Sequence, residues 1–145
     1  MSPFLESLAT LAAGLFAGAA LYVTAVEHPA RVSCGSALAV TEFRPSYERA
    51  AVMQATLALL GALAATVRWG LGGQIGWLIG GLLLGAVVPF TLIVILPTTE
   101  LLLDVSLDLN SPESAALLTR WGRLHAVRSA ASLVAFLIFV FLLVR

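Results

Sequence analysis

Apolar residues fall into four long runs that are separated by polar or glycine-containing stretches. The runs cover about residues 4–26, 47–67, 74–96 and 125–144. Each run is close to the roughly 20 apolar residues that a helix needs to cross a bilayer. The pattern predicts an all-α protein in which four transmembrane helices form an up-down bundle, with residues 1–145 as a single four-span domain.

The three connections between these runs differ in length. Residues 68–73 form a tight turn, whereas residues 27–46 and 97–124 are two longer polar loops. In an up-down bundle both longer loops lie on the same face. Pro29 is expected to help end the first helix, and Pro45 is expected in the first turn of the second.

The fourth helix is expected to begin well before its apolar part. Asn110, Ser111, Pro112 and Glu113 read as a cap, a proline at the first helical position and an acid near the positive helix end. A helix that continues to the C-terminus would be about 50 Å long at 1.5 Å per residue. Its first three turns should therefore stand outside the hydrocarbon.

Glycines recur at four-residue spacing in the first and third runs. Gly-x-x-x-Gly spacing allows helices to approach closely, so these glycines are expected to serve packing, and they also permit a homo-oligomer. Pro89 is expected to kink the third helix. The spaced pairs are Gly14/Gly18, Gly76/Gly80 and Gly81/Gly85.

Composition supports a protein embedded in a lipid bilayer. The chain is 60% hydrophobic and only 11% charged, with zero net charge, whereas soluble domains carry about 25% charged residues. Zero net charge gives no indication of a nucleic-acid partner. All eight basic residues are arginine, which reflects either genome bias or a need for a charge that persists in apolar surroundings. The single cysteine, Cys34, permits no internal disulfide, and its role stays open.

Charge near the helix ends predicts an orientation in the cell (inner) membrane. The N-terminus has no basic residue before its first run, so that run is expected to be a retained span. More arginines lie on the face with the longer loops, so these loops are expected in the cytoplasm. That face carries Arg31, Arg44, Arg49, Arg120 and Arg123, and the opposite face carries Arg68 and Arg145.

Polar residues that are distant in sequence are expected to meet at one mouth of the bundle. Trp121, His125, Arg128 and Ser132 follow a single helical stripe of the fourth run. Ionisable groups at membrane depth usually face the bundle interior and pair. Glu27 or Glu42 is therefore expected to pair with Arg128 or Arg44, and Tyr22 to point toward the same cavity; the alternative is that these side chains are anchors at the water boundary.

This set of residues is compatible with more than one chemistry. A histidine beside a carboxylate acts as a general base, and an arginine stabilises a developing oxyanion. Two histidines with a carboxylate also suit non-haem iron, and two histidines on facing helices suit haem. No metal ligand is assigned, because no HxxxH, ExxH or CxxC spacing occurs.

Four segments resemble the small integral membrane family catalogued as domain of unknown function 1772, which includes the anthrone oxygenases. They are EHPAR, TEFRPSYERAAVMQ, PFTLIVILPTTELLL and RWGRLHAVRSAASL. The resemblance implies oxidation of an anthrone to an anthraquinone by O2 with no added cofactor. Thr99 stands where the family commonly has asparagine. The matching positions are Pro29, Pro97, Trp121, His125 and Arg128.

The sequence thus favours a small membrane oxygenase that oxidises a planar, hydrophobic phenolic or aromatic substrate with O2 after deprotonation by histidine. The alternative is a non-enzymatic scaffold, a transporter subunit or a haem- or metal-binding redox protein, so enzymatic activity stays open. The candidate catalytic residues are Glu27, His28, Glu42, His125 and Arg128. The candidate substrate-binding residues are Tyr22, Arg44, Tyr47, Pro97, Thr99 and Trp121.

Overall fold

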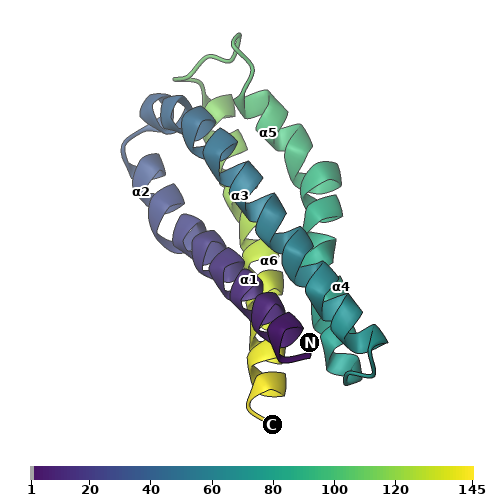
Figure 1. Cartoon of the computed structure of the whole chain (residues 1–145). Coiled ribbons are helices and arrows are strands. Elements are labelled where there is room, and N and C mark those ends of the chain that lie inside the picture. The colour runs from purple at the N-terminus through teal and green to yellow at the C-terminus, as the bar shows by residue number, and fades with distance from the viewer. Residues whose placement is uncertain (1) are drawn as a thin grey trace.

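The structure, a computed structural model, describes residues 2–145, and these form helices with no strand. Four helical spans run side by side in a bundle (Figure 1), and each is long and apolar enough to cross a membrane. Consecutive spans alternate in direction. The predicted all-α bundle of four membrane spans is therefore confirmed. The spans are Ser2–Ser33, Ser36–Gly70, Ile75–Leu102 and Pro112–Leu143.

The first span passes through a proline without ending. It consists of α1 (Ser2–Tyr22), the π-helical turn η1 (Val23–Glu27) and α2 (His28–Ser33). The His28 N–H bonds to the Val23 carbonyl, five residues back. Pro29 follows directly, and proline both removes a donor and clashes with the carbonyl four residues before it. The wider π-turn provides the room that lets the helix continue, so the expectation that Pro29 ends the helix is wrong.

The third span repeats this arrangement. It consists of α4 (Ile75–Phe90), the π-helical turn η2 (Thr91–Ile95) and α5 (Leu96–Leu102). The Leu96 N–H bonds to the Thr91 carbonyl, and Pro97 comes next. A π-turn thus directly precedes a proline in both spans.

The segment 27–46, expected as a loop, is almost entirely helical. α3 covers Ser36–Gly70 and contains Pro45 in its interior, so Pro45 does not start the helix. Between α2 and α3 lie only Cys34 and Gly35, and Gly35 has a φ of 94° that favours glycine. The prediction was wrong because hydropathy marks where a chain crosses the bilayer, whereas these helices extend beyond that depth.

The second predicted loop shrinks in the same way, to residues 103–111 between α5 and α6. α6 covers Pro112–Leu143, and the Ser111 hydroxyl accepts a hydrogen bond of 3.1 Å from the Ser114 N–H. This cap and the proline at the first helical turn confirm the predicted start of the fourth helix. The loop and the α2–α3 turn lie at one end of the bundle, while both termini lie at the other (Figure 1).

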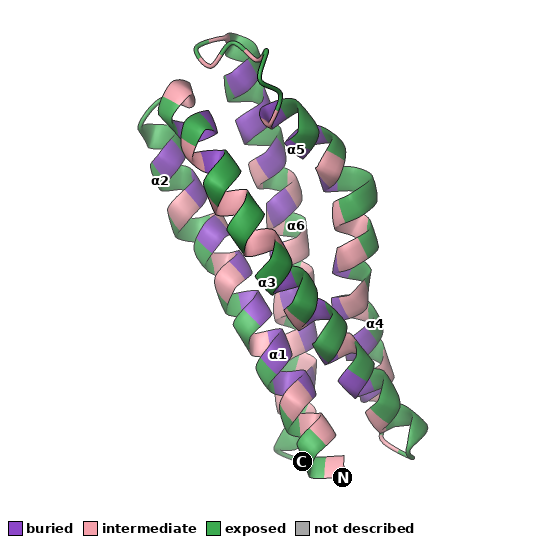
Figure 2. Cartoon of the chain, turned by 45° about the horizontal axis from the view of Figure 1, so that its top comes forward, coloured by how far each residue is buried: buried purple, intermediate pink, exposed green. Residues whose placement is uncertain are grey.

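Glycines bring α3, α4 and α6 into close contact near the termini. A Cβ on Gly80 would collide with the Phe139 ring, and one on Gly81 would lie 3.1 Å from the Ala65 Cβ. Trp77 stacks on Phe139 with ring centroids 5.2 Å apart. The buried side of each helix faces its neighbours, and the exposed side faces outward (Figure 2). The expected packing role is confirmed within the chain for five of the six glycines but not for Gly18, where a Cβ would meet nothing within 4 Å. The five are Gly14, Gly76, Gly80, Gly81 and Gly85.

Two clusters of buried apolar side chains make up the core. A lower cluster near the termini includes Phe16, Trp77, Leu84 and Phe139. An upper cluster near the loop end includes Val23, Val40, Phe43, Ile95, Leu102, Leu118 and Trp121. Residues of both clusters meet around one cavity.

Candidate functional site

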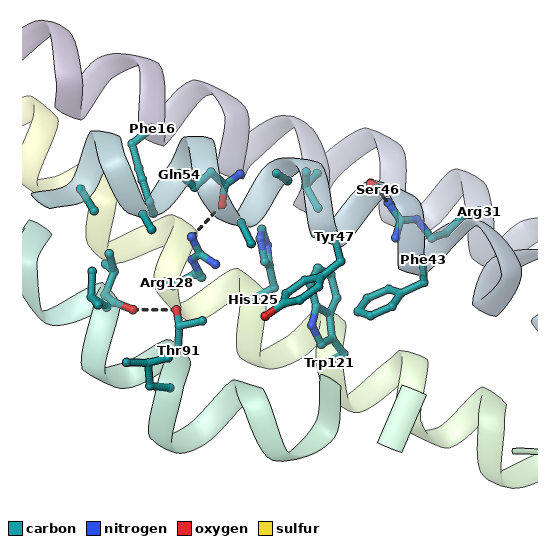
Figure 3. A pocket seen from close by; sticks show the side chains of 18 residues that line it. Phe16, Arg31, Phe43, Ser46, Tyr47, Gln54, Thr91, Trp121, His125 and Arg128 are labelled. Carbon is teal, nitrogen blue, oxygen red and sulfur yellow. Dashed lines mark hydrogen bonds between the residues drawn. The ribbon is translucent and has the colours of Figure 1, made fainter. Parts of the chain in front are cut away.

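A cavity of about 150 Å³ lies where the two core clusters meet. Figure 3 shows its side chains, which come from all four spans and are mostly apolar. A cavity of about this volume in another protein accommodates benzene. The lining includes seven polar side chains, from Arg31, Ser46, Tyr47, Gln54, Thr91, His125 and Arg128.

The stripe predicted on the fourth helix faces this cavity. Trp121, His125 and Arg128 all line it, while Ser132 is fully buried outside the lining. His125 stacks on Trp121 with ring centroids 4.6 Å apart and is only 2% exposed. The spacing of α6 therefore presents an indole, an imidazole and a guanidinium to one apolar space.

A chain of hydroxyl groups holds the His125 ring. Its Nδ1 lies 2.9 Å from the Thr24 hydroxyl, which lies 2.8 Å from the Ser129 hydroxyl. Ser129 donates in turn to the carbonyl of Ala20 over 3.1 Å. Since Nδ1 is engaged by this chain, Nε2 is the ring nitrogen that is left for a ligand.

Arg128 has no carboxylate partner among residues 2–145. It donates to the amide oxygen of Gln54 over 2.7 Å, and its guanidinium carbon lies 5.0 Å from the centre of the Phe16 ring. Each ion pair of the described residues belongs to Arg31, Arg44 or Arg68. Cations at membrane depth usually pair with an anion. The cavity thus contains a positive charge that no side chain neutralises.

The two carboxylates expected beside Arg128 or Arg44 instead bind Arg31, so that expectation is wrong. The Arg31 guanidinium pairs with Glu27, and its Nε lies 2.8 Å from Glu42 Oε2. Ser46 donates to Glu27 over 2.6 Å. Glu27 and Arg31 are four residues apart in the sequence. Because the helix continues through Pro29, this spacing places both side chains on one helix face. Arg44 instead contacts Glu48 and the carbonyl of Leu103.

His28 lies close to His125 but has a different environment. Its Nε2–H donates to the Leu118 carbonyl over 3.0 Å, and its ring lies 5.2 Å from the Trp121 ring. His28 is outside the cavity lining. Gly122 permits its approach to α6, because a Cβ there would lie 2.6 Å from His28 Nε2. Both histidines thus contact Trp121, but only His125 reaches the cavity.

Trp121 also joins the third and fourth spans. Its Nε1–H donates to the Thr99 hydroxyl over 3.1 Å, and Thr99 is completely buried. Thr99 is outside the lining, so its contact with the cavity runs through the indole. The hydrogen bond fixes the plane of the ring that covers His125.

The candidate residues thus fall into two groups. Those that line the cavity are Tyr47, Trp121, His125 and Arg128. Those that do not are Tyr22, Glu27, His28, Glu42, Arg44, Pro97 and Thr99. The expectation that Tyr22 points into the cavity is wrong, since Tyr22 is 56% exposed on the outside of the bundle.

Several lining or supporting residues were not predicted from the sequence. Gln54 is a polar residue inside an apolar run, and this feature of the sequence could have indicated a position that faces the bundle interior. Thr24 lies four residues before His28, and Ser129 lies four residues after His125. Hydroxyls inside helices usually bond to their own backbone, so their sequence positions alone do not indicate a role at a site. Phe16 and Phe43 look like any other core residue in the sequence.

Metal-ligand side chains do not gather in the described part of the chain. No group of three or more His, Cys, Asp or Glu that could hold a metal ion occurs within residues 2–145. The two histidines use one ring nitrogen each in hydrogen bonds to the protein.

Comparison with known proteins identifies the family. A family model described as anthrone oxygenase matches residues 43–138, which is more than half of the chain. No curated protein and no solved structure matches. The matched range includes Tyr47, Gln54, Trp121, His125 and Arg128, and so covers most of the polar cavity lining. The chain, whose fold places these residues around one apolar cavity between membrane spans, belongs to the anthrone oxygenase family.

Proposed function

We propose that this protein is an integral membrane oxygenase that converts a planar phenolic substrate with an acidic C–H bond, such as an anthrone, to a quinone with O2. One observation carries the proposal. His125, with Nε2 left for a ligand, and Arg128, with no carboxylate partner within residues 2–145, lie one turn apart and line the same apolar cavity. A base and a cation side by side suit removal of a proton and stabilisation of the resulting anion.

The hydrogen bonds around His125 support its role as the base. A carbonyl only accepts, so the single Ser129 proton goes to the carbonyl of Ala20 or to that of His125, and the short Ser129–Thr24 contact then requires the Thr24 proton. Thr24 in turn accepts from Nδ1–H of His125. This tautomer leaves an unprotonated Nε2, which is the form that a general base needs.

Arg128 supplies the positive charge that the substrate anion needs. Its guanidinium donates to an amide rather than to a carboxylate, so its charge is not cancelled. Because the surrounding walls are apolar, the attraction for an oxyanion is stronger than in water. The Tyr47 hydroxyl points toward the same space in Figure 3 and offers a further donor.

The reaction that follows from these roles balances. His125 removes a proton from the methylene carbon beside the rings, and the negative charge spreads to the ring oxygen near Arg128. The carbanion gives electrons to O2, a C–O bond forms, and the proton on His125 completes a hydroperoxide. Loss of the second methylene proton together with hydroxide breaks the O–O bond and releases water, which leaves a carbonyl.

The proposed reaction requires no cofactor, because the substrate carbanion itself supplies the electrons to O2. Elemental analysis and an absorption spectrum of the purified protein test this. We expect less than stoichiometric metal, no Soret band, and full activity after treatment with a chelator. Stoichiometric iron or copper, or a haem spectrum, would instead favour a metal- or haem-dependent oxygenase.

Oxygen uptake with an emodin-anthrone-like substrate tests the function. We expect His125→Ala and Arg128→Ala each to abolish turnover above the rate without protein. Arg123→Ala on the exposed side of α6 is the matched control and should retain activity. Full activity in both cavity variants would refute the mechanism, and no uptake by the unaltered protein with any anthrone or hydroquinone would favour a non-enzymatic scaffold.

We also propose that the bundle end with the 103–111 loop faces the cytoplasm of a cell membrane. Arg44, Arg49, Arg120 and Arg123 lie in exposed positions toward this end, whereas the other end has Arg145 and Arg68, and Arg68 is paired with Glu6 over 2.5 Å. Cys34 is exposed at the α2–α3 turn and is the chain's single thiol. A membrane-impermeant maleimide should label it in inverted vesicles but not in intact cells, and the reverse pattern would invert the orientation.

A further inference from the structure

The cavity is closed toward the loop end of the bundle. Phe43, Leu102 and Leu118 are almost fully buried in the upper cluster, and Tyr47 stacks on Phe43 with ring centroids 5.8 Å apart. Above them the Arg44 guanidinium donates to the Leu103 carbonyl and joins α3 to the end of α5. Water at that end is therefore separated from His125 by this apolar layer and by the buried Arg31, which lines the cavity and is held by Glu27 and Glu42.

The lower cluster closes the opposite end. Phe16, Leu84 and Phe139 are completely buried there, and α3 and α4 pack closely on each other around Gly81. Neither end of the bundle therefore offers a path to the cavity. Any path has to lead through a side wall, between two helices.

One side wall is incomplete. α3 packs extensively on α4 but makes few or no contacts with η2 and α5. In Figure 1, α3 and α5 diverge toward the loop end. Ala55 on α3 and Leu92 on η2 both line the cavity and are exposed on the surface. The cavity therefore reaches the surface between α3 and η2. The other lining residues on these two edges are Ala50, Ala51, Val88 and Thr91.

This opening lies at the depth of the hydrocarbon. At about 1.5 Å per residue, Ala55 is about 22 Å along the helix from Gly70, and Thr91 is about 24 Å from Ile75. Both values fall within the hydrocarbon core of about 30 Å. The neighbouring surface is apolar, with Val52 72% and Ile93 73% exposed. The rim therefore faces lipid chains rather than water.

We infer that the substrate reaches His125 and Arg128 sideways from the bilayer, through the opening between α3 and η2. The inference rests on the proposed function. The cavity volume suits about one aromatic ring, so a ligand of three fused rings is only partly enclosed. Its central ring, which carries the acidic methylene and the ring oxygen, lies against His125 and Arg128, and its outer rings reach into the opening. The site is then selective for the acidic central ring and tolerant of apolar substituents on the outer rings.

Binding kinetics of an unreactive ligand test this path without relying on turnover. We choose a dihydroxyanthraquinone, which lacks the reactive methylene, and measure its quenching of Trp121 in nanodiscs of a Trp69→Phe/Trp77→Phe background, in which Trp121 is the single tryptophan of the chain. Ala55→Phe narrows the opening, so passage of the ligand then requires α3 and η2 to separate, and association should slow by about tenfold. A clash with the bound ligand alone would instead speed dissociation without slowing association, and that result would contradict the path. Leu92→Ala should speed both rates.

Leu59→Phe is the matched control, one turn away on the lipid-facing surface of α3 and outside the cavity lining. Unchanged rates in both Ala55→Phe and Leu92→Ala would overturn the lateral path while leaving the proposed function in place. No quenching in the unaltered cavity would overturn the proposed function together with this inference. Quenching by brominated lipid chains that the anthraquinone does not relieve would assign the opening to a lipid instead.

Discussion

Arg128 donates a hydrogen bond of 2.7 Å to the amide oxygen of Gln54, a neutral group in a position where a buried cation would normally meet a carboxylate. The amide orients the guanidinium without cancelling its charge. Glu27 and Glu42, which were expected to pair with Arg128 or Arg44, are engaged by Arg31. The cavity is thereby prepared for a ligand that brings the negative charge itself.

Gln54→Glu should inactivate the protein while leaving it folded. The new carboxylate would pair with Arg128 and compete with the substrate anion. We expect kcat/KM to fall by at least about tenfold, which corresponds to ~1.4 kcal/mol of transition-state stabilisation. Thermal unfolding in detergent should be unchanged or shifted upward. Unaltered kcat/KM would show that the charge of Arg128 does not contribute to the reaction.

Trp121→Phe and Thr99→Val should each weaken the contact between the third and fourth spans. Each removes one partner of the same 3.1 Å hydrogen bond, and such bonds between membrane helices contribute about 1 kcal/mol. The double variant should lose less free energy of unfolding than the sum of the two single variants. Equilibrium unfolding in mixed micelles gives these values, and strict additivity would contradict a direct interaction.

Gly122→Ala should displace His28. The added Cβ would lie 2.6 Å from His28 Nε2 and would break its bond to the Leu118 carbonyl, so we expect a loss of about 1–2 kcal/mol in the free energy of unfolding. Gly18→Ala is the control, because a Cβ there meets nothing within 4 Å and alanine favours a helix by up to about 1 kcal/mol. Equal effects of the two substitutions would refute the steric argument.

Arg31→Ala should be strongly destabilising. The Arg31 side chain is only 5% exposed and neutralises two carboxylates, which are themselves 26% and 43% exposed. Water can hydrate these carboxylates after the substitution, so we expect a loss of about 1–3 kcal/mol in the free energy of unfolding, below the cost for a fully buried pair. Arg49→Ala, at an exposed position of α3, should change stability by less than about 0.5 kcal/mol. Comparable unfolding midpoints for both variants would mean that the Arg31 cluster adds little to the fold.

The periodicity of the apolar runs was sufficient to predict the four spans, and the spacing of Trp121, His125 and Arg128 was sufficient to place them on one face. Both depend on local geometry that the sequence encodes directly. The start of α6 was predictable for the same reason, because capping is determined by adjacent residues.

The ion pairs could not be predicted in this way. They depend on α2 and α3 continuing past the apolar runs, which hydropathy does not report. The continuation past Pro29 depends on a π-turn, for which the residues Val23 to Glu27 carry no recognisable pattern. Only His125 lines the cavity, and this difference between the two histidines also depends on tertiary contacts. His28 is held by Gly122 and Leu118, which lie on a helix distant in sequence.

The two π-turns make the site sensitive to the exact number of residues in each span. A π-turn takes up about one residue more per turn than an α-helix, so removal of one residue from Thr91–Ile95 would restore ordinary winding and leave the residues beyond it on nearly the same faces. Pro97 would then clash with the carbonyl four residues before it, because the room that the wider turn provides would be lost. The same loss in Val23–Glu27 would have this effect at Pro29. A deletion elsewhere in either span would instead rotate the residues beyond it by about 100°, because no wide turn would absorb it. Length changes in these spans should therefore be tolerated far less than substitutions that keep the residue count.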